Sequence, residues 1–332
     1  MSNQPTVTIN DYVGFDTVSK QMERKFLKRG LNFNIVLVGE SGMGKTTLVN
    51  TIFAGHLVDS HGRRSAQEQL RKTTEIIPTT QIIEENNIRL RLTVVDTPGF
   101  GDQTNNDGCW VPVIKYIKDQ HAAYLERELK PQRDRSINDT RVHACLYFLN
   151  PGTKGLRPID IEALKRLTEV VNVIPVLAKS DSCTIEERAI IKKRFKDELN
   201  QHRIMVYPYA SDEDDEEDLA LNLRIKELMP FAVVGSEDVY SENGVPFRGR
   251  RHAWGVINVD NEEHCDFIHL RNFMLRTHLY DLIEITAQRH YESFRTQQLR
   301  QIKELRAAQA QAQGMSQQQI APMQNMMHKQ QA

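Results

Sequence analysis

A glycine-rich segment carries the first residues whose types and spacing could do chemistry. Residues 39–46 read Gly-Glu-Ser-Gly-Met-Gly-Lys-Thr, which fits the spacing Gly-x-x-x-x-Gly-Lys-[Ser/Thr]. Glycines at these positions let the backbone turn so that several N–H groups point at phosphate oxygens. Lys45 is suited to neutralise β- and γ-phosphates, and the Thr46 hydroxyl is suited to bind Mg²⁺. The segment predicts a phosphate-binding loop; the simpler interpretation is a glycine turn between a strand and a helix.

A second segment with chemical potential ends an apolar alternation over residues 88–94. It reads Asp-Thr-Pro-Gly, from Asp96 to Gly99. An aspartate at the end of a strand can hold Mg²⁺ through water, and the Gly99 N–H can reach a γ-phosphate. The next residue is Phe100, where many small GTPases carry a glutamine that orients the attacking water. We therefore expect slow intrinsic hydrolysis.

A third segment could recognise a base. Residues 178–181 read Ala-Lys-Ser-Asp and differ at the first position from the Asn-Lys-x-Asp pattern that reads guanine. The Asp181 carboxylate can accept from the N1–H and the 2-amino group of guanine, a donor pair that adenine lacks, and the stem of Lys179 can pack along the base. With Ala178 in place of Asn, we expect a looser loop that keeps the base contact. Because two phosphate-binding segments precede it, this segment indicates GTP rather than ATP, and not merely a surface turn.

Alternating strands and helices are expected to position these segments. Residues 82–94 form a predicted hairpin with its turn at 84–87. We expect further strands over residues 33–38, 142–149, 173–177, 204–207 and 231–236, and helices over residues 47–53, 110–129, 158–171, 184–202, 219–228 and 266 to beyond 298. The order predicts a three-layer α/β fold with a mostly parallel sheet and one antiparallel hairpin strand.

A polar segment over residues 55–72 shows no clear periodicity and predicts a long loop. Thr73 and Thr74 follow it. A threonine at this place can sense a γ-phosphate through its hydroxyl or backbone. The alternative is that both threonines simply begin a strand.

Composition narrows the class of protein. The 332 residues include 43 Lys and Arg against 44 Asp and Glu, so no overall charge attracts nucleic acid. The four cysteines have no Cys-x-x-Cys spacing, residues 1–5 lack the features of a signal peptide, and no run of about 18 apolar residues occurs. We expect a reduced, intracellular compartment.

The two ends of the sequence exceed what a nucleotide-binding fold requires. Residues 20–30 combine five cations with apolar residues at roughly helical spacing, which predicts a basic helix that either lies on anionic lipid or packs on the domain. After the core, Trp254 and the helix from residue 266 suggest a protein–protein surface. Residues 309–332 are rich in Gln, Ala and Met and predict a disordered tail or frayed helix.

These segments together resemble the septins. The likeness is carried by the phosphate loop, by residues 96–102 and 178–181, and above all by Arg-Gly-Arg at 248–250 leading to Trp-Gly at 254–255. It covers roughly residues 12–299. The last of these stretches is similar to the start of the septin unique element, and the short tail is similar to that of the short-tailed fungal septins.

The resemblance implies roles for individual residues. Catalysis would involve Thr73, Lys45 and Gly99, and Mg²⁺ would be held by Thr46 and Asp96. Arg250 would stack on the guanine. GTP or GDP would be bound by Gly39, Ser41, Gly42, Gly44, Lys45, Thr46, Thr47, Thr73, Asp96, Gly99, Lys179, Asp181, Glu187, Gly235 and Arg250.

The resemblance also implies partners. Septins hold the nucleotide within a dimer interface, so Glu187 should reach the nucleotide of the neighbouring subunit, and Lys154 stands where many septins direct a histidine at the neighbour's phosphates. The family's phosphoinositide-binding stretch matches Lys20, Arg24, Lys25, Lys28 and Arg29.

The expected domains are an N-terminal basic segment over residues 1–30, a GTPase domain over 31–250, a septin unique element with a C-terminal helix over 251–300, and a tail over 301–332. The expected function is a GTP-binding subunit of septin rods and filaments at the division site, with slow hydrolysis. The alternative is a dissociating signalling GTPase.

Overall fold

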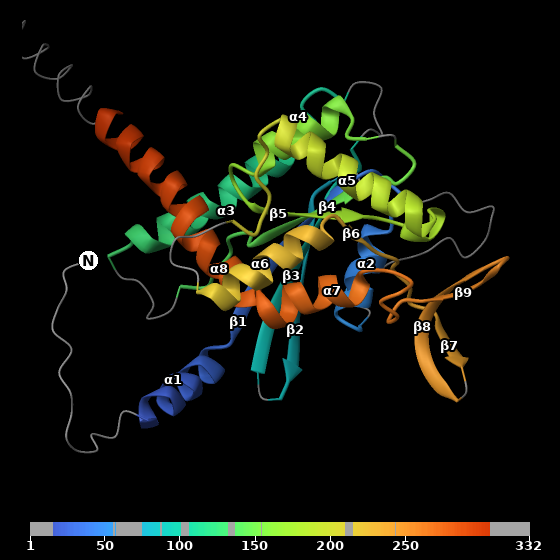
Figure 1. The fold of residues 1–332 in the computed structure, drawn as a ribbon. Helices are drawn as coiled ribbons and strands as arrows, with labels where there is room; N and C mark the ends of the chain where they lie inside the picture. Colours follow the sequence, from blue (N-terminus) through green and yellow to red (C-terminus); the bar gives the residue numbers. More distant parts are fainter. Residues whose placement is uncertain are drawn as a thin grey trace, which may run out of the picture.

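A six-stranded sheet forms the centre of the computed structural model (Figure 1). The structure describes residues 16–55, 57, 75–86, 88–100, 106–131, 137–153, 155–209, 215–242 and 244–305. The strands are β1 (Leu31–Gly39), β2 (Ile77–Glu85), β3 (Ile88–Asp96), β4 (Ala144–Leu149), β5 (Asn172–Leu177) and β6 (Phe231–Ala232). Their order is β2-β3-β1-β4-β5-β6, and β2 is the antiparallel strand. The prediction of a mostly parallel sheet with one hairpin strand is confirmed.

Helices cover both faces of this sheet (Figure 1). They are α2 (Lys45–Ile52), α3 (Val111–Leu129), α4 (Pro158–Leu167), α5 (Ile185–Gln201), α6 (Glu216–Leu228), α7 (Phe267–Asn272) and α8 (Leu279–Ile285). One apolar cluster joins the sheet to α3, α4 and α5, and the other joins it to α2, α6, α7 and α8. Strand β1 contributes to both, since Ile35 lies in one cluster and Val36 in the other. Burial on both faces explains why β4 is apolar throughout.

Two predicted strands differ from the structure. Residues 204–207 do not form a strand; they are irregular, and Tyr207 N donates to Val173 O at 3.3 Å. Pro208 follows and has no N–H with which to continue a ladder. Strand β6 ends at Ala232 rather than at 236, because the chain then leaves the sheet and approaches α2 at Gly235.

The predicted long C-terminal helix contains two π-helical turns, η2 (Phe273–Thr277) and η3 (Thr286–Tyr291), and continues as helix over residues 292–305. Next to η3, the Leu282 carbonyl accepts from Thr286 Oγ1 at 2.7 Å and from Asn172 Nδ2 at 3.1 Å. Side chains that insert at a helix carbonyl displace the regular i to i−4 pattern. The break therefore marks where the helix is tied to the start of β5.

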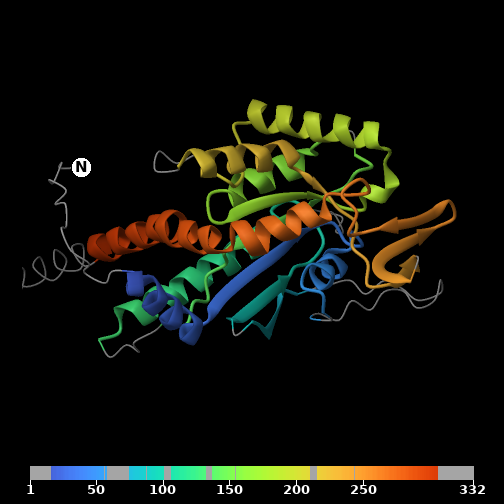
Figure 2. The same ribbon diagram turned by 60° about the horizontal axis from the view of Figure 1, so that its bottom comes forward.

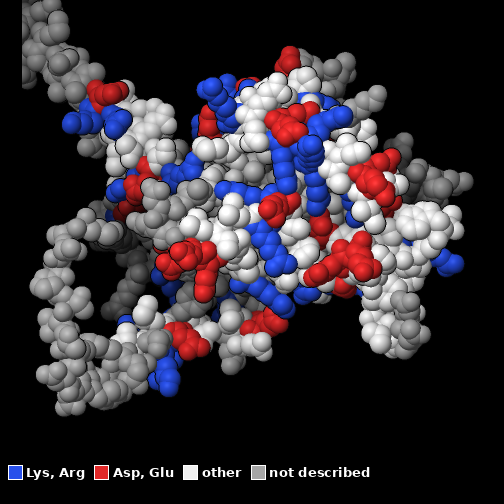
Figure 3. Space-filling model, in the orientation of Figure 1, with Lys and Arg blue, Asp and Glu red and all other residues white. Residues whose placement is uncertain are grey.

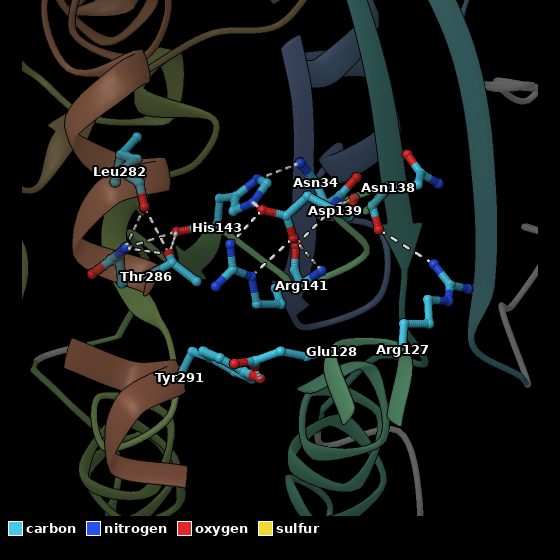
Figure 4. A network of polar contacts seen from close by, with 11 residues as sticks. Asn34, Arg127, Glu128, Asn138, Asp139, Arg141, His143, Leu282, Thr286 and Tyr291 are labelled. Atoms are coloured by element: carbon cyan, nitrogen blue, oxygen red, sulfur yellow. Dashed lines mark hydrogen bonds and ion pairs between the residues drawn. The ribbon is translucent and has the colours of Figure 1, made fainter. Parts of the chain in front are cut away.

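A buried polar network lies near the beginnings of β1, β4 and β5 (Figure 4). Arg141 donates to Asp139 through Nε at 2.9 Å and Nη2 at 2.7 Å. Its guanidinium lies 4.1 Å from the ring centroid of Tyr124 in α3 and 4.9 Å from that of Tyr291 in η3. Asn34 N donates to His143 Nδ1 at 3.0 Å. The network holds α3, β1 and the C-terminal helix together.

A three-stranded sheet follows the core: β7 (Val239–Glu242), β8 (Val245–His252) and β9 (Gly255–Asn258). The predicted turn between β7 and β8 includes Gly244, whose φ of 81° suits glycine, while Asn243 lies outside the described residues. Figures 1 and 2 place this sheet on the side of the core opposite to α1 (Asp16–Arg29) and residues 292–305. The molecule thus presents two separate ends.

Charges of both signs are interspersed over the face shown in Figure 3, in keeping with 43 basic and 44 acidic residues. Helix α1 confirms the predicted basic helix, and its five cations, Lys20, Arg24, Lys25, Lys28 and Arg29, are exposed. Within the described ranges, no helix is both long and apolar enough to cross a membrane.

Candidate nucleotide-binding site

The phosphate loop lies between the end of β1 and the beginning of α2. Gly42 and Gly44 have φ angles of 74° and 80°, in the left-handed region that glycine adopts without strain. Lys45 is buried, and its Nζ donates to Gly39 O at 3.2 Å and to Glu40 O at 2.9 Å. The loop therefore has the backbone and the cation that a phosphate needs.

Gly39 packs too closely against the neighbouring strand for any side chain. Its φ is 149°, and an added Cβ would lie 2.7 Å from Phe148 Cβ. Three further predicted residues, Ser41, Thr46 and Thr47, are partly buried around this loop. They lie together in one loop and the first turn of one helix.

The end of β3 lies directly beside the phosphate loop. Asp96 pairs with Leu37 of β1, and Thr97 Oγ1 donates to the Leu37 carbonyl at 2.6 Å. The Phe100 N–H donates to Gly39 O at 3.1 Å, so Gly99 is held next to the loop. The Phe100 side chain is 2% exposed and meets Tyr147 edge to face, with 6.4 Å between ring centroids. A core residue thus stands where many small GTPases carry a polar one.

The proposed base-reading segment is held at the end of β5. Lys179 adopts a left-handed conformation with φ of 49°, and Ser180 N donates to Val233 O at 3.1 Å. Ala178 is buried, and its N–H donates to Leu149 O at 3.1 Å. The residues on both sides of Lys179 are thus tied by backbone hydrogen bonds to neighbouring segments. The looser loop expected from Ala178 in place of asparagine stays a prediction.

Asp181 has a distinctive environment. Its side chain is 4% exposed, and its Oδ2 lies 3.1 Å from Arg250 Nη1 and 2.9 Å from His252 Nε2. Its Oδ1 is buried and has no hydrogen-bond partner within the part of the chain that the structure describes. A buried acceptor without a donor is costly, which indicates that a donor belongs there. The N1–H and 2-amino groups of guanine fit this requirement.

The segment after β6 fastens β8 to α2. An added Cβ at Gly235 would lie 3.1 Å from the backbone of Leu48, so only glycine allows this approach without displacement. Ser236 N donates to Thr51 Oγ1 at 3.1 Å, and Arg248 donates to the carbonyl of the same threonine. These contacts bring the Arg250 strand next to the phosphate loop and the base-reading segment.

Some predicted residues are not gathered into this group. Glu187 is exposed and forms a capping box at the beginning of α5: its Oε2 accepts from Thr184 N at 2.9 Å, and its N–H donates to Thr184 Oγ1 at 3.2 Å. Thr73 and Lys154 lie outside the described residues.

The structure adds four residues to those predicted from the sequence: Glu40, Asn150, Arg157 and His252. Glu40 of the phosphate loop accepts from Asn150 Nδ2 at 2.8 Å and pairs with Arg157. Hydrogen bonding to Asp160 raises the pKa of the Arg157 guanidinium. His252 contacts Asp181 from the strand that carries Arg250. The sequence could have indicated His252, because it lies two positions after Arg250 on a strand, and residues two apart on a strand share a face.

The sheet order, the glycine loop at the end of β1 and the aspartate at the end of β3 define an α/β fold of the P-loop GTPase class. The crystal structure of a septin GTPase domain from Chlamydomonas reinhardtii has the same fold, with a TM-score of 0.58 and 24% identity, and the match covers 80% of this chain and 99% of that one.

The sequence comparisons give the family. The septin family profile matches residues 29–308. Septin homolog spn2 of Schizosaccharomyces pombe is 56% identical over 90% of this chain and 90% of its own length. Cell division control protein 10 of Saccharomyces cerevisiae is 51% identical over 88% of this chain and 91% of its own length, and that of Candida albicans is 50% identical over 91% and 85%. The chain belongs to the septin family, and the predicted resemblance is confirmed.

Proposed function

We propose that this septin binds GTP or GDP and assembles with other septins into hetero-oligomeric rods and filaments that scaffold cytokinesis at the division site. The single observation that carries the nucleotide assignment is the buried Asp181 Oδ1, which lacks a donor in the described chain. The names of relatives that are about half identical, the cell division control proteins, support a role at the division site.

The ligand would be held by the residues around the phosphate loop and Asp181. Phosphate would contact the loop N–H groups and Lys45, whose ammonium now binds loop carbonyls. The donor set of Thr46 and Asp96, one hydroxyl and one carboxylate, fits Mg²⁺, which prefers oxygen ligands. When bound, Mg²⁺ would neutralise phosphate charge. Guanine would lie between Lys179, Gly235 and Arg250.

Hydrolysis is proposed to be slow and tied to interface formation. The burial of Phe100 supports this, because the residue after Gly99 has no polar group with which to orient water. Lys45, Gly99 and Thr73 are the residues assigned to catalysis. Slow turnover suits a nucleotide that serves as a lasting structural ligand rather than as a switch.

Assembly is proposed to use two different surfaces. The nucleotide side would include Glu187, Lys154 and the β7–β8–β9 sheet, on which Trp254 is 69% exposed. The terminal side would include α1 and residues 292–305, which lie at the other end of the molecule (Figure 2). Two distinct surfaces at opposite ends allow a chain of subunits to extend without closing.

The exposed cations of α1 are proposed to bind anionic phosphoinositide on the inner face of the plasma membrane. The alternative, a helix packed on the domain, is less favoured because Met22 and Val18 are 66% and 44% exposed. Apolar and cationic groups that share an exposed helix suit a lipid surface.

We propose the following domain organisation: a basic segment over residues 1–30, a GTPase domain over 31–250, a septin unique element with its helix over 251–300, and a tail over 301–332.

The deciding experiment for nucleotide binding extracts and identifies the nucleotide from the purified protein and compares GTP with XTP binding for wild type and Asp181→Asn. We expect bound guanine nucleotide and a shift of the variant toward xanthine. Unchanged GTP affinity in the variant would contradict the base assignment, and electron microscopy with co-purifying septins tests filament formation.

A further inference from the structure

Two side chains, those of Arg250 and His252, approach Asp181 and contact only one of its carboxylate oxygens. Arg250 Nη1 and His252 Nε2 both approach Oδ2, at 3.1 Å and 2.9 Å. The His252 nitrogen lies close to Oδ2 but without the alignment of a hydrogen bond. Oδ1 has no such neighbour in the described ranges. The carboxylate is therefore held by one oxygen while the other stays available to a ligand.

The fold of β8 places the Arg250 and His252 side chains on the same face. Residues 250 and 252 are two apart on this strand, whereas the Arg251 side chain points to the opposite face and is exposed. His252 is the last residue of β8 and pairs with Gly255, the first of β9. The tight turn between them carries Trp254 back over the strand end.

Trp254 lies flat on the His252 ring. The ring centroids are 4.8 Å apart, and the planes differ by 8°. Trp254 is 69% exposed, whereas the His252 side chain is 23% exposed and the Asp181 side chain is 4% exposed. The three side chains thus form one continuous contact from the surface to the buried carboxylate.

We infer that His252 is a positioning residue for guanine recognition: its ring, held by Trp254, fixes Asp181 through Oδ2 so that Oδ1 meets the base. This inference rests on the proposed guanine nucleotide binding. A fixed carboxylate accepts from N1–H and the 2-amino group together, because both donors need one carboxylate orientation. A carboxylate that is free to rotate can still accept from a single donor. Loss of His252 should therefore weaken binding of a base that carries both donors more than binding of a base that carries only the N1–H.

The test compares GDP with inosine diphosphate, which keeps the N1–H but lacks the 2-amino group. Affinities are measured by calorimetry on the full chain for wild type, His252→Phe, Trp254→Ala and Arg251→Ala. His252→Phe keeps a flat ring against Trp254 while it removes the nitrogen beside Asp181, and Arg251→Ala is the matched control on the other face of β8. We expect His252→Phe to weaken GDP binding about tenfold and inosine diphosphate binding at most about twofold.

Trp254→Ala should change the GDP preference in the same direction by a smaller factor, and Arg251→Ala should leave both affinities at the wild-type value. Equal losses for both nucleotides in His252→Phe, or no loss for either, would overturn the inference. A wild-type chain that binds neither GDP nor GTP would instead overturn the proposed function. Circular dichroism of each variant separates loss of the site from loss of the fold. We expect the fold to be kept, because the β8 hairpin lies outside the six-stranded core.

Discussion

The side-chain amide of Asn150 donates to Glu40 Oε2 at 2.8 Å, and this contact joins the loop after β4 to the phosphate loop. Arg157 pairs with the other oxygen of Glu40 and with Asp160, which lies in the first turn of α4. Residues 150–157 include Lys154, for which we propose a contact with the neighbouring subunit. Glu40 thus links the loop that would bind phosphate to the loop that would meet a partner.

We expect Glu40→Ala to lower the free energy of unfolding by about 1–2 kcal/mol, because Arg157 and Asn150 lose a partly buried charged partner. Urea denaturation measures this. The matched control is Glu162→Ala, whose partner Arg166 is 56% exposed, and we expect a change below about 0.5 kcal/mol. Equal effects of the two substitutions would contradict a structural role for the Glu40 contacts.

Gly39→Ala should destabilise the fold by about 3 kcal/mol or more, because the new Cβ would lie 2.7 Å from Phe148 Cβ and 2.8 Å from Phe148 O. Gly42→Ala is the comparison. Its φ is also positive, but an added Cβ there meets no atom of the described residues within 4 Å. We expect this variant to lose only about 1 kcal/mol in thermal unfolding. If Gly42→Ala lowered the free energy of unfolding as much as Gly39→Ala, close packing against Phe148 would not explain the effect at Gly39.

Arg141→Met should lower the unfolding free energy by about 3–5 kcal/mol, since Asp139 would keep a buried charge without the Arg141 guanidinium (Figure 4). The stacking on Tyr124 and Tyr291 would also be lost. Arg127→Met removes an exposed contact with the Asn138 carbonyl and should cost below about 0.5 kcal/mol. Urea denaturation measures the free energy of unfolding of both variants. Equal losses in the two would contradict a special role for the buried pair of Arg141 and Asp139.

Stability should fall in mild acid because of two buried histidines. Burial lowers the pKa of His121 to about 3 and that of His290 to about 4 from an ordinary value of 6.5. Below about pH 6.5 these two histidines bind protons in the unfolded chain but stay neutral in the folded chain. Their contribution to the free energy of unfolding is therefore present above pH 6.5 and is lost as the pH falls toward 4. Each histidine should contribute a slope of about 1.4 kcal/mol per pH unit in this range.

His121→Phe tests this prediction. His121 Nε2 is buried and has no hydrogen-bond partner in the described part of the chain, and its ring packs 5.5 Å from that of Phe294. We therefore expect nearly wild-type stability at pH 7 and about 2 kcal/mol more than wild type at pH 5. Urea denaturation at both pH values should give a shallower acid slope for the variant. An unchanged slope would mean that His121 is protonated in the fold.

Replacement of Arg24, Lys25, Lys28 and Arg29 by Gln should weaken binding to phosphoinositide vesicles by about a thousandfold, at about 1 kcal/mol for each cation. Vesicle sedimentation at two salt concentrations measures this. A control variant with Gln at the exposed residues Lys115, Lys118, Lys165 and Arg224 loses the same charge from other helices and should still bind. Equal binding by the two variants would remove the membrane role of α1.

The features that could be predicted from the sequence depend on neighbours along the chain. The glycine spacing of residues 39–46 predicts the loop after β1, and the capping box at Thr184 predicts the beginning of α5. Alternation over residues 88–94 predicts the second strand of the hairpin. Local hydrogen bonding and side-chain period act over a few residues, so they can be read without the fold.

The wrong prediction of a strand over residues 204–207 has the opposite cause. The segment is apolar because Ile204 and Tyr207 are buried in the core. Tyr207 N donates to Val173 O of β5, but no ladder with β5 forms among the described residues, and Pro208 has no N–H with which to extend the contact. Burial in a core and membership of a sheet give similar short apolar patterns. Only the arrangement of neighbours separates them.

The sequence by itself determined the class of fold, the phosphate loop and the segment suited to guanine, because each depends on residue types at short, fixed spacing. The tertiary structure alone decided which distant side chains meet. Asn150 and Glu40 are 110 positions apart, and His252 reaches Asp181 only because β8 crosses the end of β5. Such contacts depend on how packed layers bring strand ends together, and no period along the chain records that.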